Sequence, residues 1–408
     1  MVGVLALGYN LRGAITSLPP VFPELQASLG LSSATISILA ATPVIVFGVV
    51  SGFSAKLARR AGEERVLFGA CVLLVIGLLA RGAVPAALLF PGTIACSAAI
   101  AVMNVLLSSL IKRRWPERAG FLIGLYITAL SAGAIVGSLV SVPLWQATSG
   151  SVALTLGWLA APAALAALLW LPQLRSAPPP ASRTSTGQPG QPGQASRPAP
   201  VPHARIAVHR HAITWHVTIF MGMQSLLYYA TLSWLPTMLR DRGESASGAG
   251  DLLALMGVGN LAVSLLVPMA AQRMRSQVTL VAPTVIAIAG GLAALLYAPL
   301  GGAVAWALIL GAGQNAALAL AIFFTAARAP HAGAAASLSS LAQAVGYLLA
   351  SAGPLEVGLL HSATGSWTVP VAVLFVLCGV MFVSGLLAAR PRMLPVALED
   401  IAKAEGTV

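Results

Sequence analysis

Charge is scarce in this chain of 408 residues: only 8% of the side chains are charged, and only eleven residues are acidic. A soluble domain carries about 25% charged residues. Hydrophobic residues make up 58% of the sequence, and the mean hydropathy is +0.88. The shortage of charge therefore argues against a soluble protein and predicts a chain that crosses the membrane many times.

Cysteine is also rare, and each of the three cysteines lies alone in an apolar run: Cys71, Cys96 and Cys378. This spacing excludes a disulfide framework and a cysteine-ligated metal. Four histidines lie near one another without a carboxylate or cysteine at ligand spacing: His203, His209, His211 and His216. No glycine-rich phosphate loop and no nucleophile–base pattern is present. We therefore expect no metal, no cofactor, no enzymatic activity and no ATP-driven step within this chain.

Apolar runs dominate what remains, and twelve of them predict membrane-spanning helices. They cover residues 1–25, 33–57, 65–82, 85–111, 119–146, 152–172, 212–238, 247–271, 277–298, 301–326, 333–360 and 366–389. The segment 173–210 differs, since it is rich in Pro, Gly and Gln and poor in large apolar side chains. We expect an N-terminal six-helix bundle at 1–172, a flexible cytoplasmic linker at 173–210, a C-terminal six-helix bundle at 211–392 and a cytoplasmic tail at 393–408.

The basic residues gather on one side of this predicted topology. All but four of the twenty-three Lys and Arg fall in loops on the linker side, and the four exceptions are Arg12, Arg81, Arg240 and Arg242. The positive-inside rule makes that side cytoplasmic, with both termini inside. The net charge of +12 is thus explained by topology, and we expect a multi-pass protein of a bacterial-type inner membrane rather than a nucleic-acid-binding protein.

The two halves carry matching landmarks. Val21-Phe22-Pro23-Glu24 closes the first run, and Trp234-Leu235-Pro236-Thr237 closes the seventh. An all-α membrane protein of twelve helices, in two six-helix bundles related by pseudo-two-fold symmetry, accounts for this repeat. This architecture is typical of transporters, and in transporters built from two such bundles the substrate site lies near the membrane midplane, between the halves.

Arg12 is a charge inside the first apolar run. In a helix it lies about 16 Å from the start of the run, near the middle of a hydrocarbon core of about 30 Å. A guanidinium at that depth costs at least about 2.5–3.5 kcal/mol, so we expect it to be functional. Tyr9 and Thr16, at i−3 and i+4, share its helical face.

None of the eleven acidic residues falls near the middle of an apolar run; Glu24 and Glu356 come nearest, toward the outer end. Arg12 therefore has no evident counter-ion within the chain. A buried cation requires compensation, which a substrate anion can provide. The alternative is a structural partner for Arg12, such as a backbone carbonyl at a broken helix.

The seventh run supplies a polar and aromatic face. Gln224, Tyr228 and Thr231 follow an i, i+4, i+7 pattern, and Tyr229 lies on an adjoining face. Matching Pro23 to Pro236 places this region opposite Arg12. We expect Gln224, Tyr228 and Tyr229 to line a polar cavity; the alternative is hydrogen bonding between helices, which uses the same residue types.

The motif around Arg12 resembles a known family. Asn10-Leu11-Arg12-Gly13-Ala14-Ile15-Thr16-Ser17, followed by Pro19-Pro20 and Pro23-Glu24, is similar to the cyanate permease branch of the major facilitator superfamily, which also includes nitroimidazole exporters. The resemblance implies alternating access and a cavity lined by spans one, four, seven and ten. It therefore adds Asn104 and Gln314 to the predicted substrate-binding residues. Tyr126, Ser131 and Gln343 are weaker candidates, and Gln343 is expected to pack or latch.

Two features point to conformational change. The superfamily usually carries Gly-x-Leu-Ala-Asp-Arg-x-Gly between spans two and three, where this chain has Ala55-Lys56-Leu57-Ala58-Arg59-Arg60-Ala61-Gly62. Arg59 replaces the acidic residue, while Arg60 and Gly62 keep the basic character and the turn. Gly133 and Gly137 belong to a small-residue face of span five, which we interpret as a close approach between the halves, or alternatively as ordinary packing.

We therefore expect a secondary active or facilitative transporter of a small anion, cyanate-like or a small carboxylate, with Arg12 as the anion-binding residue. The expected partners are the lipid bilayer and that anion, and the protein is expected to be monomeric. An exporter of neutral nitroheterocycles or drugs is the alternative. A transport-inactive sensor is disfavoured by the short loops. Without a mid-membrane carboxylate, facilitated diffusion or exchange is favoured over a proton relay.

Overall fold

The computed structural model describes residues 2–83, 86–175, 208–263, 266–330 and 332–395, and the secondary structure over these ranges is helical. The predicted linker falls largely on residues 176–207, and the predicted tail largely on 396–408, both outside the described residues.

The N-terminal half begins with a helix that is interrupted near the middle of the first predicted span. Pro19 and Pro20 lack the backbone N–H that helix continuation needs, so α1 ends at Thr16 and α2 starts at Phe22. The helices of this half are α1 (Val2–Thr16), α2 (Phe22–Leu29), α3 (Ser33–Ala61), α4 (Glu63–Gly82), α5 (Leu89–Arg114), α6 (Ala119–Ala147), α7 (Val152–Gly157) and α8 (Ala160–Arg175), with 3₁₀ turns at Pro19–Val21, Ala86–Leu88 and Pro116–Arg118.

The C-terminal half repeats the pattern. Its helices are α9 (Ala212–Asp241), α10 (Ala246–Val263), α11 (Leu266–Arg273), α12 (Val278–Tyr297), α13 (Ala303–Ala327), α14 (Ala332–Thr364) and α15 (Thr368–Ala388), with 3₁₀ turns at Val208–Arg210 and Leu300–Gly302.

Each of the twelve predicted spans contains a helix or a pair of consecutive helices. Among the described residues, eight helical segments are long and apolar enough to cross a membrane by length and composition alone. The α1–α2 segment is not among them, since neither of its two helices reaches 18 residues. The uninterrupted α9 and α14 are long enough but carry more small and polar side chains.

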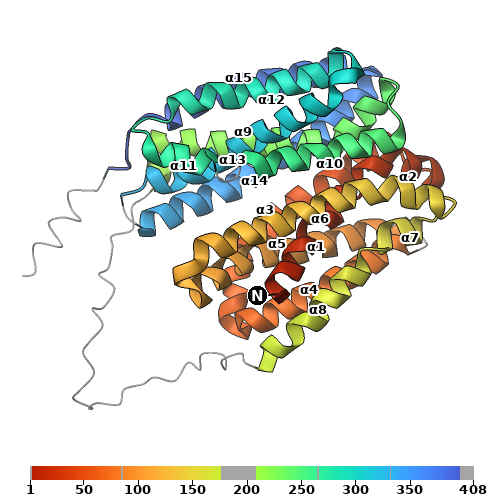
Figure 1. The fold of residues 1–408 in the computed structure, drawn as a ribbon, viewed down its shortest axis with the longest axis horizontal. Helices are drawn as coiled ribbons and strands as arrows, with labels where there is room; N and C mark the ends of the chain where they lie inside the picture. Colours follow the sequence, from red (N-terminus) through yellow and green to blue (C-terminus); the bar gives the residue numbers. More distant parts are fainter. Residues whose placement is uncertain (1, 84–85, 176–207, 264–265, 331, 396–408) are drawn as a thin grey trace, which may run out of the picture.

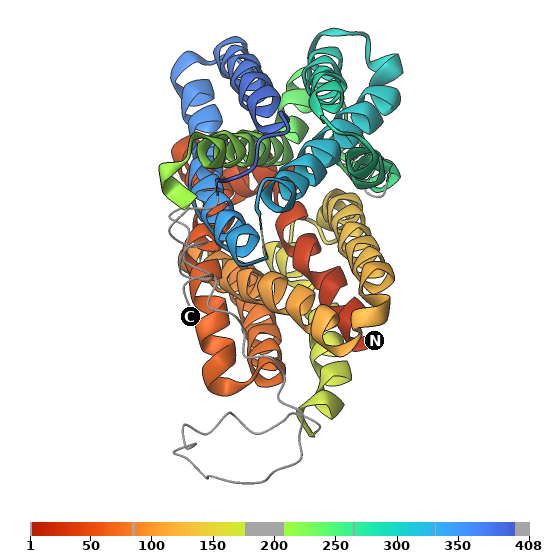
Figure 2. The same cartoon turned by 90° about the vertical axis from the view of Figure 1, so that its left-hand side faces the viewer.

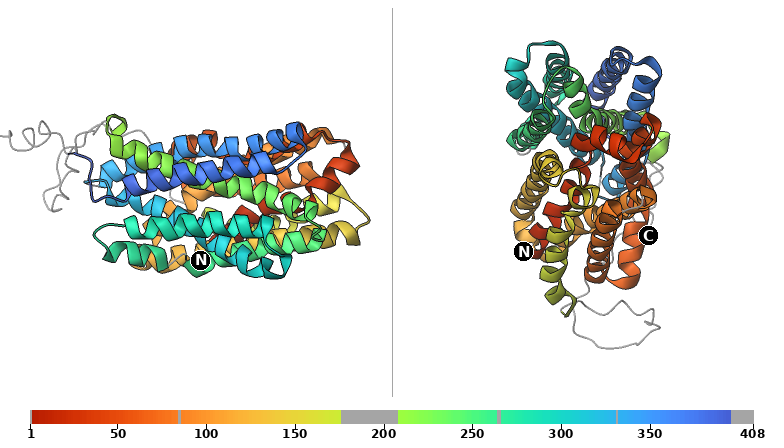
Figure 3. Two further views of the ribbon diagram at one scale, coloured as in Figure 1. Left: turned by 90° about the horizontal axis from the view of Figure 1, so that it is seen from above. Right: turned by 90° about the vertical axis from the view of Figure 1, so that its right-hand side faces the viewer.

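The helices form two bundles that lie against each other. Figure 1 shows α1–α8 (red to yellow) in one bundle and α9–α15 (green to blue) in the other, with α2 at the right-hand end. Viewed from the left-hand side of that picture, in Figure 2, the two bundles lie one above the other. The view from above and the view from the opposite end, in Figure 3, show the helices running along the length of the molecule. This arrangement agrees with the expected all-α architecture of two helical bundles.

The two ends of the molecule are named here by their residues. The linker end is where α8 ends at Arg175 and α9 begins at Ala212, and the α2 end is where α2 meets the last turn of α9. The halves meet most extensively where α3 packs on α14 and α6 packs on α10. Gly250 lies against the carbonyl oxygen of Ser138 at the second of these contacts, where an added Cβ would be 3.2 Å away. Small residues allow this close approach.

An apolar cluster and an ion pair join the halves at the α2 end. Val21, Phe22 and Leu25 of the first half belong to the same buried cluster as Trp234 and Leu235 of the second. The Phe22 and Trp234 rings lie 6.1 Å apart. Beside them, Arg240 Nη1 donates to both carboxylate oxygens of Glu24, at 2.8 and 2.9 Å. The second apolar cluster, built from the inner faces of α1, α4, α5 and α8, belongs mainly to the N-terminal half.

A charged network holds the linker end of the N-terminal half. Glu64, in the first turn of α4, is only 2% exposed and accepts from Arg113 at 3.1 Å and Arg114 at 3.0 Å. Arg113 also lies 3.0 Å from Glu63. These pairs tie the start of α4 to the end of α5 within one bundle.

Candidate substrate site between the two halves

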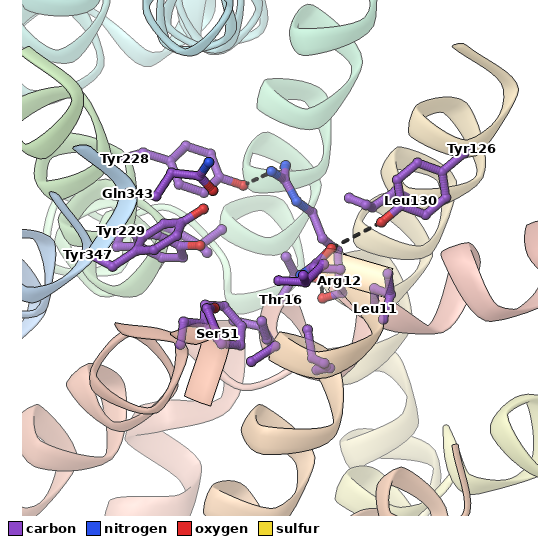
Figure 4. Close-up of a pocket in the computed structure, with 17 residues that line it drawn as sticks. Leu11, Arg12, Thr16, Ser51, Tyr126, Leu130, Tyr228, Tyr229, Gln343 and Tyr347 are labelled. Atoms are coloured by element: carbon purple, nitrogen blue, oxygen red, sulfur yellow. Dashed lines mark hydrogen bonds between the residues drawn. The ribbon is translucent and has the colours of Figure 1, made fainter. Parts of the chain in front are cut away.

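A cavity of about 360 Å³ lies between the bundles, and residues of both halves line it (Figure 4). Its lining is Leu11, Arg12, Ile15, Thr16, Phe47, Ser51, Ile100, Ala101, Asn104, Val105, Tyr126, Leu130, Tyr228, Tyr229, Leu232, Gln343 and Tyr347. Ser51, Asn104, Tyr126 and Gln343 all come from the linker-end half of their helices. The cavity therefore reaches from the centre of the molecule toward the linker end, while the α2 end is closed.

Arg12 lies at the centre of this space, one turn before α1 ends. Its Nη1 donates to the Tyr228 hydroxyl at 3.1 Å, and its guanidinium carbon lies 5.3 Å from the centre of the Tyr228 ring. Both contacts cross from the N-terminal to the C-terminal half. The ion pairs among the described residues involve Glu24, Glu63 and Glu64, and none of them includes Arg12. The cation is therefore matched to a neutral hydroxyl and an aromatic ring, which leaves most of its five N–H groups unused.

A second buried arginine, Arg81, has a different environment. It lies in the last turn of α4, is 1% exposed and donates from Nη1 to the Ala14 carbonyl at 2.6 Å. Its Nη2 donates to the Leu156 carbonyl at 3.2 Å. Ala14 and Leu156 belong to the final turns of α1 and α7, whose carbonyls lack helical partners. Arg81 thus caps two interrupted helices; its signal in the sequence, an arginine at the end of an apolar run, gave no hint of this role.

Aromatic rings form the wall that faces Arg12 from the C-terminal half. Tyr228 and Tyr229 meet edge-on, with ring centres 5.1 Å apart, and Tyr347 of α14 lies edge-on to Phe47 of α3 at 6.4 Å. In Figure 4 the hydroxyl groups of Tyr229 and Tyr347 point into the space beside the guanidinium of Arg12. A ligand at Arg12 would therefore contact ring surfaces as well as charge.

The opposite wall comes from the N-terminal half. The Tyr126 hydroxyl donates to Asn104 Oδ1 at 3.0 Å, which joins α6 to α5 beside the cavity. Thr16 lines the cavity near the end of α1, and its hydroxyl donates to the Ala134 carbonyl at 2.9 Å. Its hydroxyl hydrogen is therefore already committed to the backbone.

A smaller polar recess of about 40 Å³ adjoins the main cavity at Arg12. We call it the polar lobe, and its lining is Arg12, Gln224, Ser225, Tyr228, Tyr229, Asn260, Gln314, Asn315, Leu318 and Tyr347. Apart from Arg12, these residues come from α9, α10, α13 and α14 of the C-terminal half.

Most predicted site residues come together here. Arg12, Thr16, Asn104, Tyr228 and Tyr229 line the main cavity, whereas Gln224 and Gln314 line the polar lobe. Of the weaker candidates, Tyr126 lines the main cavity, and Ser131 lines a smaller recess that also contains Arg12. Gln343, which was expected to pack or latch, faces the main cavity instead.

Tyr9 is not among the residues that line the cavities described above, and its role in the site stays a prediction. It is half-buried one turn closer to the linker end, and the α1 backbone at its carbonyl lies directly against Gly133 of α6. The backbone of this part of α1 is therefore packed closely against α6 of its own bundle.

Among the lining residues that the sequence reasoning missed are Phe47, Asn260 and Tyr347. Tyr347 follows Gln343 by four residues on one helical face of α14, and Asn260 is a polar residue inside the apolar run of α10. Both patterns are signals of a lining position. Phe47 gave no signal, since an apolar residue in an apolar helix is ordinary.

The residues predicted for conformational change have varied surroundings. The side chain of Arg59 lies outside the described residues, Arg60 is exposed, and Gly62 joins α3 to α4 with a φ of 87°. Gly133 and Gly137 do not approach the other half. They pack against α1 in the same bundle, where a Cβ on Gly137 would lie 2.7 Å from the Thr16 hydroxyl oxygen.

Comparison with characterised proteins places this geometry in a family. Residues 5–354 match the Major Facilitator Superfamily. The chain is 37% identical over 402 residues to the uncharacterized transporter YycB of Bacillus subtilis (strain 168), covering 96% of this chain and 94% of that protein. It is 34% identical over 392 residues to the 2-nitroimidazole transporter of Escherichia coli (strain K12), covering 96% and 95%. It is 27% identical over 399 residues to the cyanate transport protein CynX of the same strain, covering 98% of each chain.

The fold is shared with solved transporters as well. A bacterial homologue of the human lysosomal transporter Spinster, solved in an inward-facing and unoccupied conformation, superposes with a TM-score of 0.73 at 18% identity, covering 96% of this chain and 98% of that chain. At this identity the likeness establishes the fold alone. With a family match over most of the sequence and relatives of similar length, the chain belongs to the major facilitator superfamily and is a multi-pass, non-enzymatic membrane transport protein of a small molecule.

Proposed function

We propose that the protein transports a small anion, cyanate-like or a small carboxylate, by alternating access, with Arg12 as the residue that binds the negative group. The observation that carries this proposal is the environment of Arg12. A permanently charged guanidinium lines a cavity between the halves, and its partner among the described residues is the neutral hydroxyl of Tyr228. A buried cation left in this way is stabilised when an anion binds.

The shape of the guanidinium favours an oxygen-bearing anion. Its planar fork donates two parallel hydrogen bonds to a carboxylate or a similar group. A cationic substrate would be repelled, because the main cavity carries Arg12 and no acidic residue among those that line it. The same lining offers no carboxylate for a dedicated proton relay, which supports exchange or facilitated diffusion.

Both halves would hold the substrate. Arg12 belongs to the N-terminal half, whereas Tyr228, Tyr229 and Tyr347 belong to the C-terminal half. A ligand bound between them gains contacts from each bundle, as expected for a site about which the halves rock. The α2 end would open when Glu24 separates from Arg240.

A second candidate is transport of a neutral nitroheterocycle. A relative with 34% identity is a 2-nitroimidazole transporter, and the tyrosine wall offers ring faces for a planar heterocycle. Arg12 would then donate to the nitro oxygens. The anion is preferred because a neutral ligand leaves the buried charge uncompensated.

The arrangement of the chain in the membrane forms part of the proposal. We take 1–172 and 211–392 as the two bundles, 173–210 as a cytoplasmic linker and 393–408 as a cytoplasmic tail, with both termini inside and a monomeric protein. Access of a membrane-impermeant reagent to single cysteines placed in the linker would test the orientation.

The test of substrate class is a thermal-shift screen of purified protein with a panel of anions and nitroheterocycles. A ligand that binds the native state raises apparent stability. We expect anions to stabilise the protein and Arg12→Ala to remove that shift. The uptake of the best ligand into vesicles is then measured. Normal uptake by both Arg12→Ala and Arg12→Lys would show that Arg12 does not bind the transported anion.

A further inference from the structure

We infer that the polar lobe is a second recognition subsite, in which Gln314 and Asn260 bind a neutral hydrogen-bonding group of the anion held by Arg12. The inference rests on the proposed function and narrows its substrate class. The ligand would be a compact, planar organic anion that carries a hydroxyl, carbonyl or amide group away from its charge.

The position of the lobe links it to the anion site. Arg12, Tyr228, Tyr229 and Tyr347 line both the main cavity and the lobe, so they form the boundary between them. A ligand whose charge lies on Arg12 can extend past the tyrosine rings into the lobe. Flat groups suit that passage, because aromatic rings pack well in edge-on and offset arrangements.

Two amides in the lobe have unused hydrogen-bonding atoms. Gln314 is 3% exposed, and neither its Oε1 nor its Nε2 has a hydrogen-bond partner among the described residues. Asn260 is 8% exposed, and its Oδ1 likewise has none. Buried amide groups are normally paired, so unpaired ones at a recess call for a partner.

The neighbouring polar groups, by contrast, are paired. Gln224 Nε2 donates to the Ser225 hydroxyl at 2.6 Å, and Asn315 Nδ2 donates to the backbone carbonyl of Asn260 at 2.7 Å. The unpaired atoms are therefore confined to particular side chains of a polar region rather than spread over it. This selectivity distinguishes a recognition subsite from general polarity between helices.

The helix that carries Gln314 is firmly placed. Gly311 lies against the Met256 carbonyl of α10, and Gly313 lies against Ala287 and Ile288 of α12. These close contacts fix the backbone of α13 between two neighbours, so the position from which the Gln314 side chain extends into the lobe is set by packing. Binding there would cost little reorganisation.

Charge and size define what the lobe accepts. Arg12 is the charged residue among those lining it, and its charge is assigned to the anionic group. A second anionic group in the lobe would lack its own cation. The lobe volume of about 40 Å³ is far smaller than the 360 Å³ of the main cavity, so we assign a substituent of a few atoms, rather than a whole ring, to the lobe. An amide both donates and accepts, which suits a hydroxyl group best.

The experiment compares three probes on purified full-length protein: benzoate, 4-methylbenzoate and 4-hydroxybenzoate. Dissociation constants would be measured by titration calorimetry for the wild type and for Gln314→Met, which keeps the length of the side chain and removes the amide. Gln343→Met is the matched control, because Gln343 lines the main cavity outside the lobe. Arg12→Met tests the anion site itself.

We expect the wild type to bind 4-hydroxybenzoate about tenfold more tightly than 4-methylbenzoate, since one hydrogen bond to a buried amide accounts for roughly that factor. Gln314→Met should reduce the ratio of the affinities for 4-hydroxybenzoate and 4-methylbenzoate to about one, while Gln343→Met should leave that ratio unchanged. Asn260→Leu should reduce it too, which provides a second variant. The melting temperature of ligand-free Gln314→Met should equal or exceed that of the wild type, because no made hydrogen bond is lost.

The outcomes separate the two proposals. If Arg12→Met abolishes binding but Gln314→Met and Asn260→Leu retain the hydroxyl preference, the subsite is wrong and the anion site stands; water filling the lobe would give this result. If the wild type binds none of the three probes, the substrate class inferred here is wrong. If Arg12→Met binds the probes as the wild type does, the proposed function fails.

Discussion

Arg12 and Arg81 are two buried arginines of the same bundle, and neither faces a carboxylate among the described residues. Both Nη atoms of Arg81 are hydrogen-bonded, Nη1 to the Ala14 carbonyl and Nη2 to the Leu156 carbonyl and the Ser17 hydroxyl, whereas its buried Nε has no partner among the described residues. Arg12 reaches only the Tyr228 hydroxyl and faces open space. The difference teaches that burial of a charge does not by itself identify a binding site; a charge that lines a cavity and makes few hydrogen bonds is the better indication.

The largest expected effect is on stability, at Arg81. Replacing Arg81 by Met removes the charged donor from the carbonyls of two helix ends, Ala14 and Leu156. Hydrogen bonds from charged donors contribute about 1.5–3 kcal/mol each, so we expect the free energy of unfolding to fall by about 3–5 kcal/mol. Thermal denaturation in detergent measures this. An unchanged melting temperature would show that Arg81 does not stabilise the fold, and the proposed difference between Arg81 and Arg12 would then be wrong.

Arg12 should behave in the opposite way. Arg12→Met removes an uncompensated charge, so stability should change by less than about 1 kcal/mol, while affinity for the transported anion falls at least about 100-fold, or about 2.7 kcal/mol. Arg12→Lys should restore only part of the affinity, because an ammonium lacks the planar fork. Ligand titration measures the affinity for the anion, and thermal denaturation measures the stability of the variant. A loss of stability as large as that of Arg81→Met would show that Arg12 is structural.

The Tyr228 hydroxyl sharpens the comparison, since it is the polar group that holds the Arg12 fork across the halves. Tyr228→Phe should lower transport at least about tenfold, in line with about 1.5–3 kcal/mol for one hydrogen bond to a charged group. Vesicle uptake is the measurement. Tyr297→Phe is the control, because Tyr297 is exposed at the end of α12 and should tolerate the change fully. Equal uptake by the Tyr228→Phe and Tyr297→Phe variants would show that the Tyr228 hydroxyl has no role in transport.

The smallest effect is expected at the ion pair of Glu24 and Arg240. Their side chains are 17% and 25% exposed, so the pair contributes about 0.5–1 kcal/mol. Glu24→Gln should therefore shift the balance two- to fivefold toward a state open at the α2 end. Alkylation of a cysteine introduced at Phe22 would report that opening. The double variant Glu24→Arg with Arg240→Glu should restore the original rate of cysteine alkylation. If that rate stays raised in the double variant, the two charges do not act as a pair.

Much of the fold followed from the sequence because apolar runs leave little choice in a bilayer. Arg12 was found for the same reason, since a charge in such a run has few explanations. The interruption of α1 after Thr16 follows from Pro19 and Pro20, but its consequence, free carbonyls within reach of Arg81, depends on where α4 ends.

The rest depended on how the halves meet. The faces of α10 and α14 that turn toward Arg12 are set by packing between bundles, which helical periodicity does not specify. Asn260 and Tyr347 were missed on that account. The close packing of the α1 backbone at Tyr9 on Gly133 of α6 was likewise not evident from the sequence. Gly133 and Gly137 were assigned to the contact between halves, although they serve the contact within one.

The apolar cluster at the α2 end has a thermodynamic consequence. Phe22 and Leu25 share that cluster with Trp234 and Leu235, so opening this end exposes apolar surface to water. Exposure of apolar surface raises the heat capacity. The free-energy difference between the state that is closed at the α2 end and the state that is open there should therefore vary with temperature along a curve rather than a line. Because hydrophobic stabilisation weakens on cooling, low temperature should favour the state that is open at the α2 end.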